Sequence, residues 1–476
     1  MKQHYLSGLL LGCLLVGGSA QAQLVIDGTN FTNMGTVTNR DAYTLITNAS
    51  GSAYSASGGA VFQHYETSAD AFRVNSAYNA NGTGGSTDAF SGPNGTAGTQ
   101  GVSGSVAPNF STLLLQNGST SLFAFTNTAG ANVYTAVTFQ NALTTTLRNL
   151  HQAGALRFQA GATYSGGTTD AQHVDGYVSK IGNTAFTFPI GSATDLRTLA
   201  LAASTDASNH ISAAWFAGSP ATVTDPSDNA THSVTSLTGP ITGVSTVGFW
   251  DYIRVAGSGA VNVTVSIPDV TSFGTAASLR LVGWNGSSWI NLSGSTGASG
   301  NTENSTLSGT IPAGTTITAL AIGKAAAALP DLTVSAEIDN SEFKQAGQAN
   351  GHGYLVTLYE IKGVATSDVI TFIIQRPANW SFDYPANATT INVNGGTTVD
   401  NANWTLSASG RFLTVTSKPG VSIPANGSVR IGINFFVPTA LAENTTQNVT
   451  ININAGTGGG ETPSSNNLAV TALTFN

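Results

Sequence analysis

The 59 residues from Ala89 to Leu147 contain no lysine, arginine, aspartate or glutamate. The segment consists mostly of Gly, Ser, Thr, Asn and Ala, interrupted by Leu, Phe, Val and Tyr. A helical domain of this length needs charged faces for solubility and strong helix formers to hold its backbone. Short neutral polar residues mixed with β-branched and aromatic residues favour stacked β-strands joined by tight turns. The sequence therefore predicts an all-β protein.

The N-terminus predicts export. A mostly apolar run from Leu6 to Val16 follows Lys2, and Ala20-Gln21-Ala22 supplies a small-x-small cleavage site. We expect a signal peptide over residues 1–22, with cleavage between Ala22 and Gln23, and a secreted or extracellular protein that is associated with a cell surface. The segment before Cys13 resembles a lipoprotein box, but the apolar run continues past Cys13, so cleavage after Ala22 is preferred.

The cysteine count and the charge of the chain limit its possible crosslinks and binding partners. Cys13 is the single cysteine, so cleavage after the signal leaves no disulfide. The chain carries 16 basic and 24 acidic residues and has no basic patch, which disfavours nucleic acid and anionic membranes as partners. No later segment is apolar enough to cross a bilayer, so we expect no transmembrane segment.

Residues 23–178 form the first expected domain. From Asn109 onward, short apolar runs alternate with turn residues at a spacing that fits a β-sandwich or a solenoid of stacked rungs. Scarce charge and abundant Asn, Ser and Thr favour a parallel β-helix, because small polar groups stack well at strand spacing. An irregular sandwich is the alternative. The Gly-, Ser- and Asn-rich segment 53–104 is expected to be a long loop or a poorly ordered insertion.

Two β-sandwich domains are expected to follow the parallel β-helix-like region. Residues 179–324 contain strands of alternating polarity and a hairpin signal at Asn285-Gly286. A small-residue linker is expected over 325–330, where a proline discourages any helix. Residues 331–476 show the clearest alternation, with about seven or eight strands, which is typical of an Ig-like sandwich.

Several motifs resemble segments of bacterial surface proteins. Gly176–Gly191 resembles the junction at which a Gly/Asn/Thr-rich β-solenoid gives way to a sandwich in large secreted proteins of Bacteroidota, and Phe249–Asp251 and Trp284–Trp289 resemble that family's sandwich. Asp331–Val334 resembles the opening strand of Ig-like repeats, including the adhesion-related CARDB class. The resemblance implies an exported surface or matrix protein and brings no catalytic residue. Residues 468–476 do not resemble the sorting domain with which such proteins often end, so the mode of attachment stays open.

No catalytic motif is recognisable. The histidines are scattered, and the sequence lacks a His-Glu-x-x-His zinc signature, a nucleophile elbow and a phosphate-binding loop. Asn350-Gly351-His352-Gly353 contains the Gly-His-Gly element of β-helical polygalacturonases, but the chain has no Asp-Asp pair, so His352 is interpreted as a turn residue. We expect no enzymatic activity, no catalytic residue and no cofactor.

Two sets of residues are weak candidates for ligand contact. Asp225 and Asp228 offer carboxylates to calcium, but their spacing matches no known loop, and a solvated turn without metal is preferred. Trp215, Trp380 and Trp404 can stack on sugars if they are exposed, although a strand tryptophan more often packs in a core.

The sequence leaves three functions open. The first is a non-catalytic structural or adhesive protein that contacts other cell-surface proteins or copies of itself. The second is a glycan-binding protein that assists polysaccharide capture at a surface. Exposed coplanar aromatic rings would favour glycan binding, and buried rings would favour the structural function. A polysaccharide-degrading enzyme is the weakest option, since it needs a cleft with two facing carboxylates.

Overall fold

The computed structural model divides the chain into two compact units, Met1–Ala326 and Ala327–Asn476. The division falls within the segment 325–330. The structure describes residues 23–27, 30–40, 43–47, 53–66, 72–82, 84–92, 99–116, 121–140, 142–193, 195–326, 328–339, 342–343, 351–378, 380–437 and 441–475. Among these residues, no helix is long and apolar enough to cross a bilayer.

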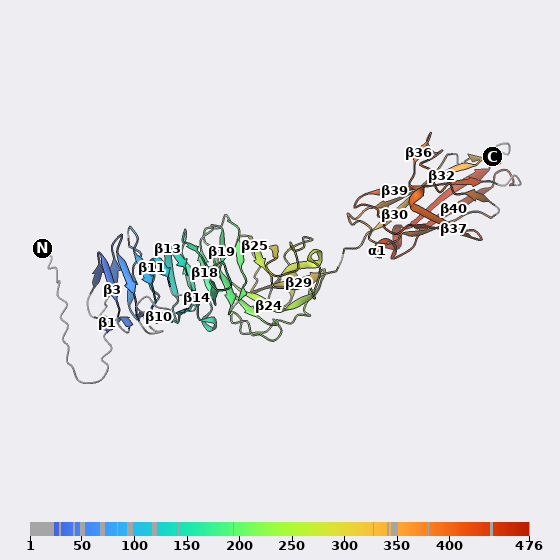
Figure 1. The fold of residues 1–476 in the computed structure, drawn as a ribbon. Coiled ribbons are helices and arrows are strands. Elements are labelled where there is room, and N and C mark those ends of the chain that lie inside the picture. The colour runs from blue at the N-terminus through green and yellow to red at the C-terminus, as the bar shows by residue number, and fades with distance from the viewer. Residues whose placement is uncertain are drawn as a thin grey trace, which may run out of the picture. The chain divides into compact units, whose positions relative to one another are not determined.

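The first unit begins with a parallel β-solenoid, as the sequence predicts (Figure 1). One sheet contains, in spatial order, β1 (Gln23–Ile26), β4 (Tyr43–Ile46), β7 (Phe72–Val74), β10 (Gln100–Gly104), β12 (Ser121–Phe125), β14 (Ala142–Thr145), β17 (Val174–Asp175), β20 (Ile190–Ser192) and β21 (Asp195–Leu196). Every pair from β1 to β20 is parallel, so each strand lies directly above its counterpart in the preceding turn.

Each turn of the solenoid also contributes strands to a second sheet. Its parallel part contains β2 (Phe31–Asn33), β5 (Ala53–Ala56), β8 (Ala77–Asn79), β11 (Asn109–Leu115), β13 (Ala131–Phe139), β15 (Leu156–Phe158) and β18 (Val178–Ile181). A branch adds β3 (Thr36–Asn39), β6 (Val61–His64) and β9 (Thr87–Phe90), and β16 (Thr163–Ser165) pairs with β13. The prediction of a loop or insertion over 53–104 is wrong, because that segment supplies the strands β5 to β10.

Stacked side chains fill the solenoid and also line its surface. Inside, Tyr54 and Tyr78 occupy equivalent positions in neighbouring turns, and their ring centroids lie 4.3 Å apart. Outside, Asn109 donates to Asn79 at 2.8 Å, and Asn132 donates to Asn109 at 2.8 Å. Parallel strands stacked about 4.8 Å apart bring such equivalent positions into contact. Small polar residues such as these asparagines therefore pair between neighbouring turns on the outer surface of the solenoid.

An antiparallel region completes the first unit. The second sheet continues from β18 into β23 (His210–Ala217), β24 (Ile241–Ala256), β29 (Ala319–Ala325), β26 (Leu279–Trp284) and β27 (Trp289–Asn291). A separate sheet contains β19 (Phe186–Phe188), β22 (Leu199–Leu201), β25 (Val261–Ser266) and β28 (Thr306–Ile311). One hydrophobic core runs through both regions, since it joins Phe158 of the solenoid to Val263 and Trp250. The antiparallel sheets thus close one end of the solenoid core.

The second unit consists of two larger sheets around a core of its own. The first sheet contains β30 (Leu332–Ile338), β32 (His352–Glu360), β39 (Ser428–Phe436) and β34 (Ser381–Asp383). The other contains β31 (Glu342–Phe343), β41 (Leu468–Phe475), β40 (Thr446–Ile453), β33 (Thr371–Gln375), β38 (Phe412–Ser417) and β37 (Trp404–Ser409), and β35 (Thr390–Ile391) pairs with β36 (Thr397–Thr398). Val356 and Ile433 from one sheet join Phe372 and Ile451 from the other in this core. The Ig-like assignment of this unit stays a prediction.

Candidate functional site

Asp225 organises the loop that joins β23 to β24, and its side chain is fully buried. Its Oδ1 accepts hydrogen bonds from the backbone N–H and the hydroxyl of Ser227, at 2.9 and 2.8 Å. Its Oδ2 lies 2.9 Å from Nε2 of His232. A backbone bridge between Asp225 and Ala230 closes the turn. The carboxylate therefore holds both sides of this loop together.

The same turn brings Asp228 to His232. Oδ2 of Asp228 lies 3.8 Å from Nε2 of His232. One ligand atom each from Asp225, Asp228 and His232, which we call the loop cluster, all lie within 4.8 Å of one another. The sequence pointed to the two aspartates and missed the histidine. His232 follows Asp228 by four residues, and this spacing could have suggested that the two side chains meet. In a loop, however, residues four apart meet only if the backbone turns, and the sequence does not show that turn.

Aromatic rings fix the orientation of the His232 imidazole, which is buried. It stacks on Trp284 with a centroid distance of 4.8 Å and an interplanar angle of 28°, and it meets the edge of Trp289 at 6.0 Å. Trp289 in turn donates from Nε1 to the carbonyl of Ser233 at 3.1 Å. This packing directs Nε2 of His232 toward the two carboxylates.

Asp251 on β24 lies behind the loop cluster and is fully buried. The hydroxyl of Tyr177, at the end of the solenoid, donates to Oδ2 of Asp251. The pKa of Asp251 is raised above its usual range. Burial makes the largest contribution to this shift, and the negative charge of Asp225 makes the next largest. The Oδ1 atom of Asp251 has no hydrogen-bond partner among the described residues. Two buried carboxyl groups, Asp225 and Asp251, therefore face each other at this position.

The loop cluster opens onto a hollow in the first unit. The Asp228 hollow has a volume of about 510 Å³. It is lined by Asn149, His151, Thr224, Pro226, Ser227, Asp228 and Asn229. Asp228 is the exposed member of the cluster, so it connects the buried pair Asp225 and His232 with solvent.

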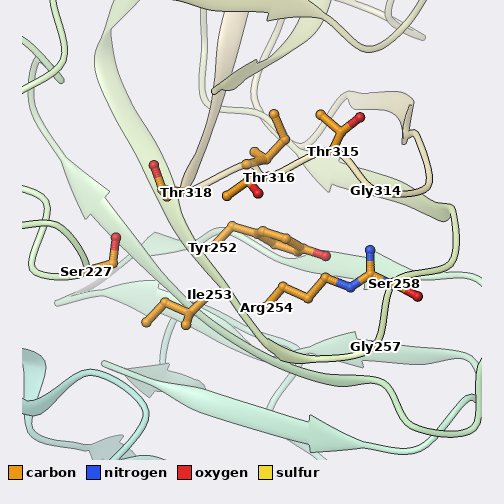
Figure 2. A pocket seen from close by; sticks show the side chains of 11 residues that line it. Ser227, Tyr252, Ile253, Arg254, Gly257, Ser258, Gly314, Thr315, Thr316 and Thr318 are labelled. Atoms are coloured by element: carbon orange, nitrogen blue, oxygen red, sulfur yellow. The ribbon is translucent and has the colours of Figure 1, made fainter. Parts of the chain in front are cut away.

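The Tyr252 hollow lies on the other side of Ser227 and has a volume of about 400 Å³. Figure 2 shows the Tyr252 ring in it, between Arg254 and the loop that carries Thr315 and Thr316. Burial raises the pKa of Tyr252, and its hydroxyl has no hydrogen-bond partner among the described residues. The hydroxyl-bearing side chains of Ser258, Thr315 and Thr316 line this hollow together with the guanidinium-bearing side chain of Arg254.

A second cluster of ionisable groups lies inside the solenoid. Nδ1 of His64 lies 3.0 Å from Glu66, and Nε2 lies 3.2 Å from Asp88. The hydroxyl of Tyr78 also donates to Asp88. Burial alone lowers the pKa of His64, but the charges and hydrogen bonds of Glu66 and Asp88 outweigh it and raise the pKa to about 9. These side chains are at most 1 % exposed, so the cluster stabilises the solenoid and offers nothing to a ligand.

The tryptophans that were candidates for sugar stacking are buried. Trp215, Trp380 and Trp404 are each 1 % exposed. Trp215 packs on Trp250 with ring centroids 4.5 Å apart, and Trp404 meets the edge of Phe372 at 5.8 Å. Buried rings of this kind present no face to a sugar.

The remaining predicted positions lie apart from these clusters. His352 begins β32 in the second unit, where its Nδ1 lies 3.2 Å from Oδ1 of Asp339. The backbone of Gln23 begins β1, and Ala22 lies outside the described residues. The signal peptide and its cleavage therefore stay predictions.

Comparisons with known proteins assign no family to the chain. No family model matches it, and no curated protein matches it. Among solved structures, it is similar to the N-terminal domain of the Streptococcus gordonii adhesin Sgo0707, with 10 % identity, a TM-score of 0.24, and coverage of 63 % of this chain and 81 % of that chain. The resemblance to Bacteroidota surface proteins and CARDB repeats stays a prediction.

Proposed function

We propose that this chain is a non-catalytic structural or adhesive protein, secreted by a bacterium and held at or near a cell surface. The solenoid acts as a stiff spacer, and the antiparallel sheets and the Ig-like unit act as contact modules. Its partners are other cell-surface proteins or copies of itself. The observation that carries this proposal is the burial of all six tryptophans, none of which is more than 8 % exposed.

The burial of the tryptophans separates the two main functions. A protein that captures polysaccharide usually presents aromatic rings to solvent, where sugar rings stack on them. In this chain Trp215 and Trp250 pack on each other, and Trp284 and Trp289 enclose His232. Their large apolar area is therefore used to hold sheets together, as expected of a protein whose role is mechanical.

The outer surface of the solenoid supports the same conclusion. Neutral side chains pair across neighbouring turns: Thr32 with Ser55 at 3.1 Å, and Thr38 with Gln63 at 2.8 Å. Contacts made by such a surface are individually weak and depend little on salt. Several copies engaged together multiply their affinities, so modest contacts suffice for adhesion.

The facing carboxyl groups do not favour a glycosidase. The two catalytic carboxyl groups of such enzymes stand at least about 5 Å apart across an open cleft. Asp225 and Asp251 are both fully buried and interact directly through their carboxyl groups. Neither carboxyl group is open to a glycan, which supports a non-catalytic protein.

Glycan binding is the second candidate, and one observation favours it. The Tyr252 hollow, of about 400 Å³, is lined by hydroxyl groups that include those of Ser258 and Thr316. A neutral sugar ring would find hydrogen-bond partners in these hydroxyl groups. This site would bind a single glycosyl unit without a stacking platform.

Incubation of the purified chain with a panel of polysaccharides tests the proposal. We expect no release of reducing ends or unsaturated products, and we expect beads coated with many copies to adhere to one another or to cell-surface preparations. Turnover that Asp251→Asn abolishes would overturn the proposal. Retention of one polysaccharide that Ser258→Ala and Thr316→Val weaken, and that Thr264→Val on the outer face of β25 leaves unchanged, would establish the glycan-binding function instead.

A further inference from the structure

We infer that Asp225, Asp228 and His232 bind a divalent transition-metal ion and that Zn²⁺ is the ion their chemistry suits best. Four ligands at about 2.0–2.1 Å around a tetrahedral zinc ion lie roughly 3.3 Å from one another. The Nε2 atom of His232 lies 2.9 Å from Asp225 Oδ2 and 3.8 Å from Asp228 Oδ2, on either side of that separation. All three ligand atoms lie within 4.8 Å of one another, so small side-chain movements suffice to place them around one ion.

The balance of charge at this position favours a cation. Asp225 is fully buried, and Asp228 adds a second carboxylate from the exposed side. Within the described part of the chain, His232 is the basic side chain that forms an ion pair with this group. A buried carboxylate destabilises the folded state unless a positive charge lies beside it. A bound metal ion would supply the missing positive charge.

Asp251 provides an independent observation. Its carboxyl group faces that of Asp225, and its Oδ1 has no hydrogen-bond partner among the described residues.

The ligand atoms select the type of ion. Calcium and magnesium prefer shells made of oxygen atoms, with six or more ligands. Imidazole nitrogen combined with carboxylate oxygen suits zinc and neighbouring transition metals. The presence of His232 therefore moves the expected ion from calcium, which Asp225 and Asp228 suggested by themselves, to zinc.

The surroundings provide access to the ion. Asp228 lines the hollow of about 510 Å³ together with Asn149 and His151, so an ion can enter from that side. Three protein ligands leave a further coordination position for water or for a donor group of a partner. The ion would fasten the loop between β23 and β24 onto the sheet, since Asp225 lies against Asp251 of β24.

Metal titration of the purified chain tests this inference. The protein carries no histidine tag and is first stripped with a chelator, and Zn²⁺, Mn²⁺ and Ca²⁺ are then titrated separately by calorimetry. We expect one equivalent of Zn²⁺ to bind and to raise the melting temperature. Co²⁺ should give the absorption bands of a site with nitrogen and oxygen ligands. Because His232 stacks on Trp284, metal binding should also change tryptophan fluorescence.

Variants connect the binding to these side chains. We expect Asp228→Asn and His232→Gln each to weaken Zn²⁺ binding at least tenfold. Asp269→Asn, an exposed turn aspartate, and His210→Gln on β23 serve as matched controls and should bind like the wild type. Asp228 is partly exposed, so Asp228→Asn should fold even if His232→Gln does not, and near-UV circular dichroism checks both. Absence of Zn²⁺ uptake, unchanged uptake in a folded Asp228→Asn variant, or preference for Ca²⁺ would each overturn the inference.

Discussion

The Nδ1 atom of His64 lies 3.0 Å from Oε1 of Glu66 inside the solenoid, where both side chains are fully buried. Asp88 lies 3.2 Å from the opposite ring nitrogen, so the imidazole is held between two carboxylates from two turns. The ring also stacks on Phe90 of the next turn, with centroids 4.1 Å apart. A charged histidine therefore takes a place in the stack that an aromatic residue would otherwise fill.

This arrangement predicts that the first unit loses stability as the pH rises. The pKa of His64 is 6.5 in the unfolded chain and about 9 in the folded protein. The stabilisation is thus fully present below pH 6.5 and is lost as the pH rises through 9. This difference in the pKa of His64 corresponds to a contribution to the free energy of unfolding on the order of 3 kcal/mol. Denaturant unfolding between pH 6 and pH 9.5 measures it. His64→Gln should flatten the profile, and identical profiles for both proteins would contradict the prediction.

Asn79, Asn109 and Asn132 form a ladder of hydrogen bonds on the solenoid surface, and this asparagine ladder should stabilise the stacking of the turns. Asn109 donates to Asn79 and accepts from Asn132, each at 2.8 Å. Asn109→Ala removes both hydrogen bonds, and we expect a loss of about 1–2 kcal/mol in the free energy of unfolding. A double-mutant cycle with Asn79→Ala checks that the loss arises from the contact. Strictly additive effects of the two substitutions would show that the ladder contributes no coupling energy.

Substitution of Phe110 should destabilise the first unit and leave the second unchanged. Phe110 is fully buried in the solenoid core, and the second unit has a separate core that contains Phe372. Phe110→Ala should cost about 3–5 kcal/mol because the cavity closes only in part. Scanning calorimetry should show a lower transition temperature for one unit only. Phe372→Ala is the matched control and should lower the other transition. A shift of both transitions by either variant would disprove their independence.

Residues 331–476 should fold when expressed alone. The division of the chain places them in a unit whose buried residues form their own cluster. Dispersed amide resonances in an NMR spectrum of the isolated segment would meet this expectation. A collapsed spectrum would mean that the segment needs contacts with the first unit.

Pattern and composition were sufficient to predict the architecture of much of the chain. The absence of charge over Ala89–Leu147 and the regular turns after Asn109 predict a solenoid, because stacked parallel strands accept small neutral side chains at equivalent positions. The alternation of Val449, Ile451 and Ile453 likewise predicts a strand with one buried face, and all three are buried on β40. These are local signals, because alternate side chains of a strand point to the same face and the resulting apolar alternation is visible in the sequence.

The strands within 53–104 were missed for a physical reason. Glycine-, serine- and asparagine-rich sequence is compatible with turns as well as with solenoid rungs, and local propensity does not separate them. His64, Glu66 and Asp88 become a buried cluster only when the turns stack in register. The pairing of β6 with β9 places His64 directly beside Phe90, which no local pattern indicates.

The residues of the candidate site differ in how far local sequence could indicate them. Asp225 and Asp228 could be named from the sequence because a short turn keeps them together. His232 joins them through the path of the loop, and Asp251 and Tyr177 meet although they are 74 residues apart. Burial of the tryptophans was likewise decided by the packing of sheets. Local patterns determine strands and turns, whereas the convergence of distant polar groups depends on how strands pair, and strand pairing follows from the whole core.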